Sequence, residues 1–163
     1  RRERVGSQRQ IHHIVACKLK PDPNLHTVSS SGESRMFTHM RIAKPVTDLA
    51  RSCLMYCQGL GLHKIAEFND HDGFNGIMLG RQGLGWHIEF TWCQYHPVQP
   101  LQTEEDLLVL YYPDKKEWSD ACARMREAGF TLTNSFNPYW DVNGQTFVDP
   151  DGYRVVLQNK AWG

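Results

Sequence analysis

Three short segments of the chain alternate polar and apolar side chains in a way that could assemble a binding site. The segments are 37–44, 86–92 and 153–159, and their polar members are His39 and Arg41, His87 and Glu89, and Arg154 and Gln158. The positions between them are apolar, for example Ile42, Ile88 and Val155. A period of two is typical of β-strands, so each strand is expected to turn its apolar face to a core and its polar face to a cavity.

This set of side chains suits a ligand with an anionic or strongly polar group. A carboxylate in a cavity needs a nearby cation, because an unpaired buried charge is costly, so Glu89 is expected to pair with Arg41. The guanidinium fork of Arg41 could hold a ligand carboxylate or phosphate, with Arg154 as a second contact. Alternatively, Arg41 and Glu89 form only a structural ion pair that closes a small cavity.

Two other kinds of chemistry are open at these positions. His87 and Glu89 lie two residues apart on one strand face and could supply two metal ligands, but the favoured interpretation of His87 is a solvated histidine at a strand end. A catalytic metal needs about three protein ligands, so both are weak candidates and no cofactor is expected. Aromatic side chains could also wall a planar ligand, or simply pack on the sheet. They are Tyr139, Trp140, Trp86 and Trp92.

The elements that would carry these residues occur twice. The first half is expected to contain a strand at 37–44, a helix beginning with Thr47 as N-cap and ending at Gly59 and Gly61, and strands at 62–68, 74–80 and 86–92. After a linker at 93–102, the second half is expected to contain a strand at 106–112, a helix from Asp114 to Gly129 with Trp118 on its apolar face, and strands near 130–134, 144–148 and 153–159. The order βαβββ therefore repeats.

The same residues give the chain a resemblance to a known superfamily. Ile42–Leu49, the helix exit from Tyr56 to Leu62, the closing segment Asp149–Leu157 and the stretch 137–140 resemble the vicinal-oxygen-chelate proteins, which include glyoxalases, bleomycin-resistance proteins and extradiol dioxygenases. The resemblance covers about residues 37–160. It implies an α+β fold of two tandem βαβββ modules curled around a pocket.

Metal enzymes of this superfamily place one ligand on each of four strands that face the pocket. The matching positions are Arg41, Glu89, a residue near Leu108, and Val156. Only Glu89 can bind a divalent cation, so the resemblance implies a metal site too degraded to hold a metal.

The composition indicates the class of protein and its cellular location. The 163 residues suffice for one domain, with 40% hydrophobic residues, 22% charged residues and zero formal net charge. No apolar stretch approaches the roughly 18 residues of a membrane span, and the N-terminus lacks the apolar segment of a signal peptide. We therefore expect a cytoplasmic protein without a membrane partner. The five cysteines form no CxxC pair and are expected to be buried, reduced thiols.

Residues 1–35 differ from the rest of the sequence. They contain seven of the 18 Lys and Arg residues and three of the 18 Asp and Glu residues. We expect a disordered or non-native leader at 1–35, although the apolar run 11–17 could add a strand. A single domain is expected at 36–163, with modules at 37–92 and 105–160.

Three functions are compatible with these patterns. The first is a homodimeric small-molecule binding protein of the bleomycin-resistance type, which holds a polar or anionic ligand without metal. The second is a metal-dependent lyase, isomerase or dioxygenase of the same superfamily. The third, which we do not expect, is a nucleic-acid or protein partner module that uses the basic leader.

Overall fold

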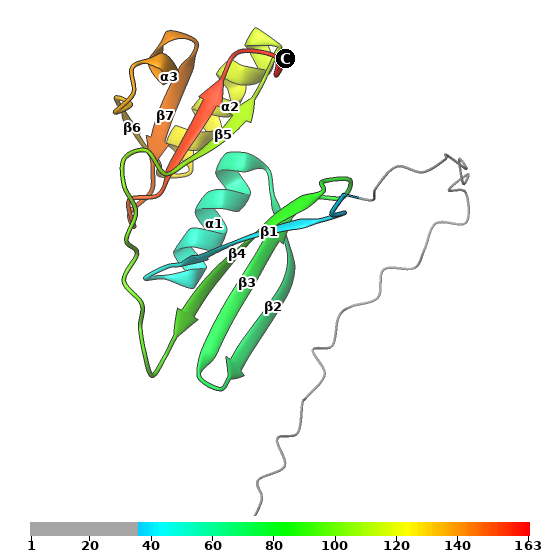
Figure 1. Ribbon diagram of the computed structural model, residues 1–163, viewed down its shortest axis with the longest axis vertical. Helices are drawn as coiled ribbons and strands as arrows, with labels where there is room; N and C mark the ends of the chain where they lie inside the picture. Colours follow the sequence, from blue (N-terminus) through cyan, green and yellow to red (C-terminus); the bar gives the residue numbers. More distant parts are fainter. Residues whose placement is uncertain (1–35) are drawn as a thin grey trace, which may run out of the picture. The chain divides into compact units, whose positions relative to one another are not determined.

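The computed structural model describes residues 36–163 and contains two sheets of four strands, each with one long helix (Figure 1). The first module consists of β1 (Met40–Pro45), α1 (Leu49–Leu60), β2 (His63–His71), β3 (Phe74–Gly80) and β4 (Trp86–Cys93). The second consists of β5 (Leu107–Tyr111), α2 (Lys115–Glu127), β6 (Thr131–Thr133), α3 (Tyr139–Val142), β7 (Gly144–Val148) and β8 (Arg154–Gln158). The predicted α+β class and the βαβββ repeat are confirmed. Predictions about residues 1–35 lie outside the described residues.

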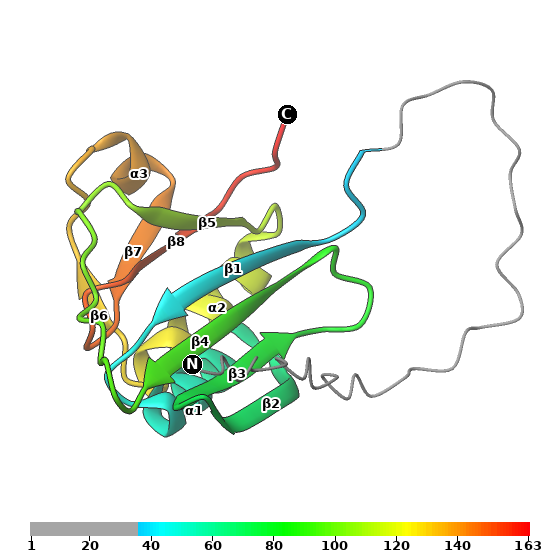
Figure 2. The ribbon, with the colours of Figure 1, turned by 60° about the horizontal axis from the view of Figure 1, so that its bottom comes forward.

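Both sheets have the same strand order. In the first sheet it is β1-β4-β3-β2, as Figure 2 shows, and in the second it is β5-β8-β7-β6. The first strand of each module pairs in parallel with the last strand, and the remaining pairs are antiparallel. The register of β1 and β4 places Arg41 opposite His87 and Ala43 opposite Glu89. The candidate residues of the first module therefore lie on two adjacent strands.

Each long helix begins at an aspartate and ends before a glycine with positive φ. Asp48 caps α1 by accepting a hydrogen bond from the Arg51 N–H at 2.9 Å, and Asp114 caps α2 through the Glu117 N–H at 2.8 Å. Gly61 and Gly129 have φ values of 67° and 97°, which glycine adopts without strain. The predicted cap at Asp114 is confirmed. The predicted cap at Thr47 is wrong, because Thr47 instead binds the second module.

Gly59 also has a different role from the one predicted. It lies inside α1 and is buried, rather than ending the helix. A Cβ atom at this position would come within 2.8 Å of the Met125 sulfur and 3.1 Å of the Phe130 ring. Gly59 therefore allows the close approach of α1 to α2.

The apolar faces of both sheets meet the two helices in one hydrophobic core. Ile88 and Phe90 of β4 and Val155 and Leu157 of β8 are completely buried in it, as the alternation predicts. Trp118 packs against its edge and donates its indole N–H to the Leu157 carbonyl at 2.8 Å. Cysteines 93 and 122 are buried, while Cys53 and Cys57 are half-buried on α1. Burial raises the pKa of Cys57 to about 11, which favours the thiol over the thiolate.

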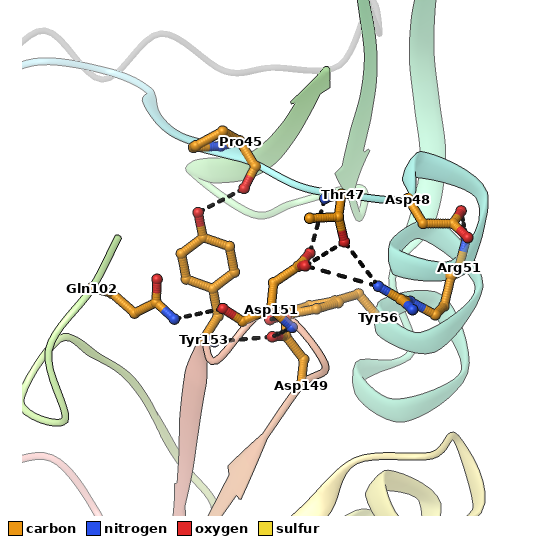
Figure 3. A network of polar contacts seen from close by, with 9 residues as sticks. All are labelled: Pro45, Thr47, Asp48, Arg51, Tyr56, Gln102, Asp149, Asp151 and Tyr153. Carbon is orange, nitrogen blue, oxygen red and sulfur yellow. Dashed lines mark hydrogen bonds and ion pairs between the residues drawn. The ribbon is translucent and has the colours of Figure 1, made fainter. Parts of the chain in front are cut away.

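A polar network joins the two modules at the turn between β7 and β8 (Figure 3). Tyr56 of α1 donates its hydroxyl hydrogen to Asp149 at 2.9 Å, and Tyr153 donates to the Pro45 carbonyl at 2.6 Å. Thr47 donates its hydroxyl and its backbone N–H to the two carboxylate oxygens of Asp151, at 2.5 and 3.2 Å. The Asp149-Pro150-Asp151-Gly152 turn, which the sequence indicated only as a tight turn, therefore holds the first module against the second.

Two features of the second module were not predicted. The helix α3 follows β6 and precedes β7, where the sequence indicated only a connection. The strand β6 is also shorter than the predicted 130–134. Among residues 36–163, no helix combines the length and apolar character required to cross a membrane.

Candidate functional site

Four candidate side chains of β1, β4 and the residues just before β1 form one connected cluster. Arg41 donates its Nε hydrogen to His87 Nε2 at 3.0 Å and places Nη1 2.7 Å from Glu89 Oε2. His87 Nδ1 lies 2.6 Å from His39 Nε2. The pairing of Arg41 with Glu89 that the sequence predicted is present. We call these four residues the Arg41 cluster.

The hydrogen bonds of the Arg41 cluster determine where its protons lie. An arginine only donates, so His87 Nε2 must accept and His87 must be neutral with its proton on Nδ1. His87 then donates to His39 Nε2, which leaves any proton of a neutral His39 on Nδ1. Burial lowers the pKa of His87, and the positive charge of Arg41 lowers it further. Both effects favour this neutral form.

The Arg41 cluster is buried at one end and accessible at the other. Glu89 and His87 are only 7% and 8% exposed, whereas the Arg41 side chain is 51% exposed. The favoured interpretation of His87 as a solvated histidine is therefore wrong. Glu89 Oε2 is buried and has no hydrogen-bond donor among the described residues, because Arg41 is close enough for an ion pair but is not aligned for a hydrogen bond.

The candidate residues on β8 lie apart from this cluster. Arg154 pairs with Glu104 at 2.9 Å and donates to the Asn134 carbonyl at 3.4 Å, and its side chain is only 12% exposed. Gln158 is 3% exposed, and its Oε1 has no hydrogen-bond partner in the part of the chain that the structure describes. Within residues 36–163, no hydrogen bond or ion pair connects Arg154 with the Arg41 cluster. Each arginine therefore has its own carboxylate.

The segment 134–143 explains the burial of the β8 residues. Val156 faces away from the core yet is completely buried, and its neighbour in register is Thr146 of β7. The hydroxyl of Ser135 contacts that of Thr146, and the Ser135 N–H lies 3.2 Å from both carboxylate oxygens of Asp141. The helix α3 lies against β7 in the same segment. This segment therefore covers the face of the second sheet that the sequence assigned to the pocket.

The predicted aromatic wall divides between the two faces of the fold. Tyr139 and Trp140 belong to α3, with ring centres 5.0 Å apart, and Tyr139 is 57% exposed. Trp86 packs against the hydrophobic core, and Trp92 shares its side of β4. Tyr139 instead lines a cavity of about 240 Å³ with Tyr111, Lys160 and Trp162, which the sequence analysis missed. The Arg41 cluster does not line this cavity.

A second cavity, of about 210 Å³, is apolar. It lies beside β1 and β5 and is lined by residues such as Ile42, Trp86 and Leu110. No member of the Arg41 cluster lines this cavity either. Arg41, whose side chain is half exposed, therefore lies outside both of these cavities.

The positions that correspond to metal ligands do not fit a metal. Arg41 and Val156 stand at two of them. Leu108 packs against the core, so the fifth-strand position falls on its neighbours Leu107 or Val109, which are also apolar. Among residues 36–163, no three His, Cys, Asp or Glu side chains are grouped closely enough to hold a metal ion. The donor set therefore supports no step through a metal.

Two βαβββ modules, each with its first strand beside its last, define a protein of the vicinal-oxygen-chelate superfamily. The chain belongs to the YycE-like family: the YycE-like N-terminal domain matches residues 40–91 and the YycE-like C-terminal domain matches residues 105–159. The uncharacterized protein YycE of Bacillus subtilis (strain 168) is 36% identical over 120 residues, which are 74% of this chain and 86% of that protein.

Solved structures support the same assignment. A crystal structure of B. subtilis YycE, described as a protein of unknown function with a provisional place among the glyoxalase/fosfomycin resistance proteins, has a TM-score of 0.71 at 35% identity and covers 78% of this chain and 92% of that one. The trypanothione-dependent glyoxalase I of Leishmania major reaches 0.58 at 21% identity, covering 78% and 88%. TnmS3, an antibiotic binding protein from Streptomyces sp. CB03234, reaches 0.55 at 20% identity, covering 77% and 98%. The last two support the fold alone.

Proposed function

We propose that the protein binds a small molecule with an anionic or strongly polar group at the Arg41 cluster, without a metal. The observation that carries this proposal is the half-exposed guanidinium of Arg41, which is fixed by two buried partners, His87 and Glu89. Its Nη2 has no polar partner among residues 36–163. An arginine held in this way loses little side-chain entropy when it binds a ligand.

The charge and proton positions favour an acceptor as the ligand group. Arg41 presents N–H donors, and the hydrogen-bond order places the proton of a neutral His39 on Nδ1, which has no hydrogen-bond partner among residues 36–163. These two donors, from His39 just before β1 and from Arg41 on β1, suit the oxygens of a carboxylate or phosphate. Arg154, which is paired with Glu104 and largely buried, is not part of this proposed site. Tyr139, Trp140 and Gln158 are not part of it either, because they lie on α3 and β8 of the second module and not beside the Arg41 cluster.

The test is a thermal-shift screen of small carboxylates and phosphates, followed by calorimetry on variants. A charge-assisted contact contributes roughly 1.5–3 kcal/mol, so Arg41→Ala should weaken binding about ten- to a hundredfold. Arg41→Lys should restore only part of the affinity, because an ammonium lacks the planar fork. The matched control is Arg124→Ala, which removes an exposed arginine of α2 and should bind like the wild type. Hits that are neutral or cationic, or that bind Arg41→Ala with full affinity, would leave Arg41 as the structural partner of Glu89.

The metal-dependent alternative is tested by metal analysis of protein purified without chelators. A cation near Arg41 would be repelled by about 4 kcal/mol per unit charge at 4 Å with an effective dielectric of 20. We therefore expect no stoichiometric transition metal. About one metal per chain, lost in Glu89→Ala, would support the lyase, isomerase or dioxygenase alternative instead.

The remaining sequence-based predictions concern partners and location. We propose a homodimer, which sedimentation velocity would test, and a cytoplasmic location, which cell fractionation would test. Retention on DNA that depends on salt and is lost when residues 1–35 are removed would favour the nucleic-acid alternative.

A further inference from the structure

The strand β3 turns two glycines to the sheet face that carries the Arg41 cluster. Met78 lies opposite Glu89 in register, so its side chain points to this face. Gly76 and Gly80 are two positions away on either side, and alternation places them on the same face. A Cβ atom at Gly80 would lie 3.3 Å from the Cβ of His87, which agrees with this facing. The two glycines leave room for side chains of the next strand, β2.

Apolar side chains of β2 occupy that room. Ile65 is the extra residue of a β-bulge on β2, and its Cδ1 lies 3.0 Å from the place that a Cβ atom at Gly80 would take. The ring of Phe68, which pairs with Gly76, fills the space beside that glycine in the same way. We call Ile65, Met78 and Phe68 the apolar strip, because together they cover β3 on this face.

The apolar strip is accessible and lies one strand away from the guanidinium. Arg41 reaches over β4, where it contacts His87 and Glu89, and β3 is the next strand of the sheet (Figure 2). Neighbouring strands are about 4.8 Å apart, and the four residue steps from Gly80 to Gly76 span about 13 Å. Ile65 is 49% exposed, and the other two members of the strip are half-buried. One small ligand can therefore contact both Arg41 and the strip.

We propose that the ligand of the Arg41 cluster is an amphipathic anion. Its carboxylate or phosphate binds Arg41, and its apolar body lies on the apolar strip. This inference rests on the proposed function and adds the chemical class of the ligand. A small polar anion leaves the strip in water, whereas an apolar body that covers the strip gains free energy from burial.

Four probes separate the head group from the body. Acetate is the anionic head alone, hexanoate adds four methylene groups, hexyl phosphate changes the anion, and hexylamine gives a similar chain a positive charge. Dissociation constants are measured by NMR titration of the full chain at constant ionic strength. A fully buried methylene group adds about fourfold in affinity, and a half-covered one about twofold. We therefore expect hexanoate to bind about ten- to twentyfold more tightly than acetate, and hexylamine to bind at least about tenfold more weakly than hexanoate. The ratio of hexanoate to hexyl phosphate shows which head group the site prefers.

Variants then assign the apolar body to the strip. Ile65→Ser should reduce the preference for hexanoate over acetate by about three- to tenfold. The matched control is Leu54→Ser, which removes an aliphatic side chain that is 58% exposed on α1 and should keep the preference. Both side chains are exposed, so circular dichroism should show two folded variants. Arg41→Ala should weaken the binding of both acids.

The possible failures can be told apart. Hexanoate that binds no more tightly than acetate, or an unchanged preference in Ile65→Ser, would overturn this inference and leave the proposed function in place. Full affinity of Arg41→Ala for both acids, or no binding of hexanoate by the wild type, would overturn the two together. If hexanoate gains nothing over acetate and Ile65→Ser converts a dimer into a monomer in sedimentation velocity, the strip is instead a contact between two copies of the chain.

Discussion

The Tyr56 hydroxyl lies 2.9 Å from the carboxylate of Asp149, although the two residues are 93 positions apart in the sequence and belong to different modules. Both are buried, and Asp149 also accepts hydrogen bonds from the backbone N–H groups of Asp151 and Tyr153 at 2.9 Å. Burial raises the pKa of Asp149, while these donors act in the opposite direction. The contact between modules is therefore sensitive to the loss of a single donor.

Tyr56→Phe removes that donor and keeps the ring. Because a buried acceptor is left without one of its partners, we expect the free energy of unfolding to fall by about 1–3 kcal/mol. Urea unfolding followed by circular dichroism measures the change. Tyr95→Phe is the matched control, since Tyr95 is 64% exposed and its hydroxyl has no hydrogen-bond partner among residues 36–163. A Tyr56→Phe protein as stable as this control would contradict the importance of the contact.

Gly59→Ala should destabilise the fold, although the same change inside most helices stabilises by up to about 1 kcal/mol. The new Cβ would come within 2.8 Å of the Met125 sulfur, so α1 and α2 would have to separate or Met125 would have to move. Overpacking of this kind costs about 1–3 kcal/mol. The melting temperature, measured by thermal unfolding, shows whether the substitution stabilises or destabilises the protein. If Gly59→Ala melts higher than the wild type, Met125 adapts without cost and the close approach is not required.

Arg41→Ala should lower stability as well as affinity, because Glu89 is 7% exposed and would lose its cation. We expect a loss of about 1–3 kcal/mol, below the 3–5 kcal/mol of fully buried pairs because Arg41 is half exposed. Arg41→Ala combined with Glu89→Gln should recover part of the loss. Chemical denaturation of the wild type, the two single variants and the double variant gives a double-mutant cycle, which isolates the interaction energy between Arg41 and Glu89. Additive effects would show that the ion pair contributes nothing.

Stability should fall when the pH falls below about 6.5, the ordinary pKa of histidine, because His87 has a lowered pKa in the folded state. In that range the unfolded chain binds more protons than the folded chain, so protonation favours unfolding. Protonated His87 could no longer accept from Arg41. Unfolding free energies at pH 7.5 and 5.5 test this. The loss should be smaller in His87→Gln, and an equal loss would assign the pH effect to other groups.

The order of strands and helices could be predicted because it depends on local patterns. Alternation at 87–91 and 154–158 identified which residues face the core, since one side of each strand is covered by a helix. The cap at Asp114 was also predictable, because its partner Glu117 lies only three residues away. The contact of Arg41 with Glu89 followed from charge and facing together.

The errors occurred where a distant residue decides the outcome. Thr47 has the right type for an N-cap, but its hydroxyl binds Asp151, 104 residues later. Gly59 looks like a helix stop, yet its role depends on Met125 of another helix. Arg154 alternates with the core like Arg41, and only the position of Glu104 and the segment 134–143 removes it from the candidate site. No local pattern contains this information.

The segment 134–143 makes the two halves of a repeated fold unequal. Each module offers one sheet face away from the core, but in the second module Ser135 and α3 occupy that face, so the polar chemistry is concentrated on β1 and β4. Substitutions at Val156 and Thr146 are therefore limited by packing volume, whereas those at His39 and Arg41 are limited by charge and hydrogen bonding. The two repeated modules therefore differ in this face: in the first module it carries the polar Arg41 cluster, and in the second it extends the buried interior.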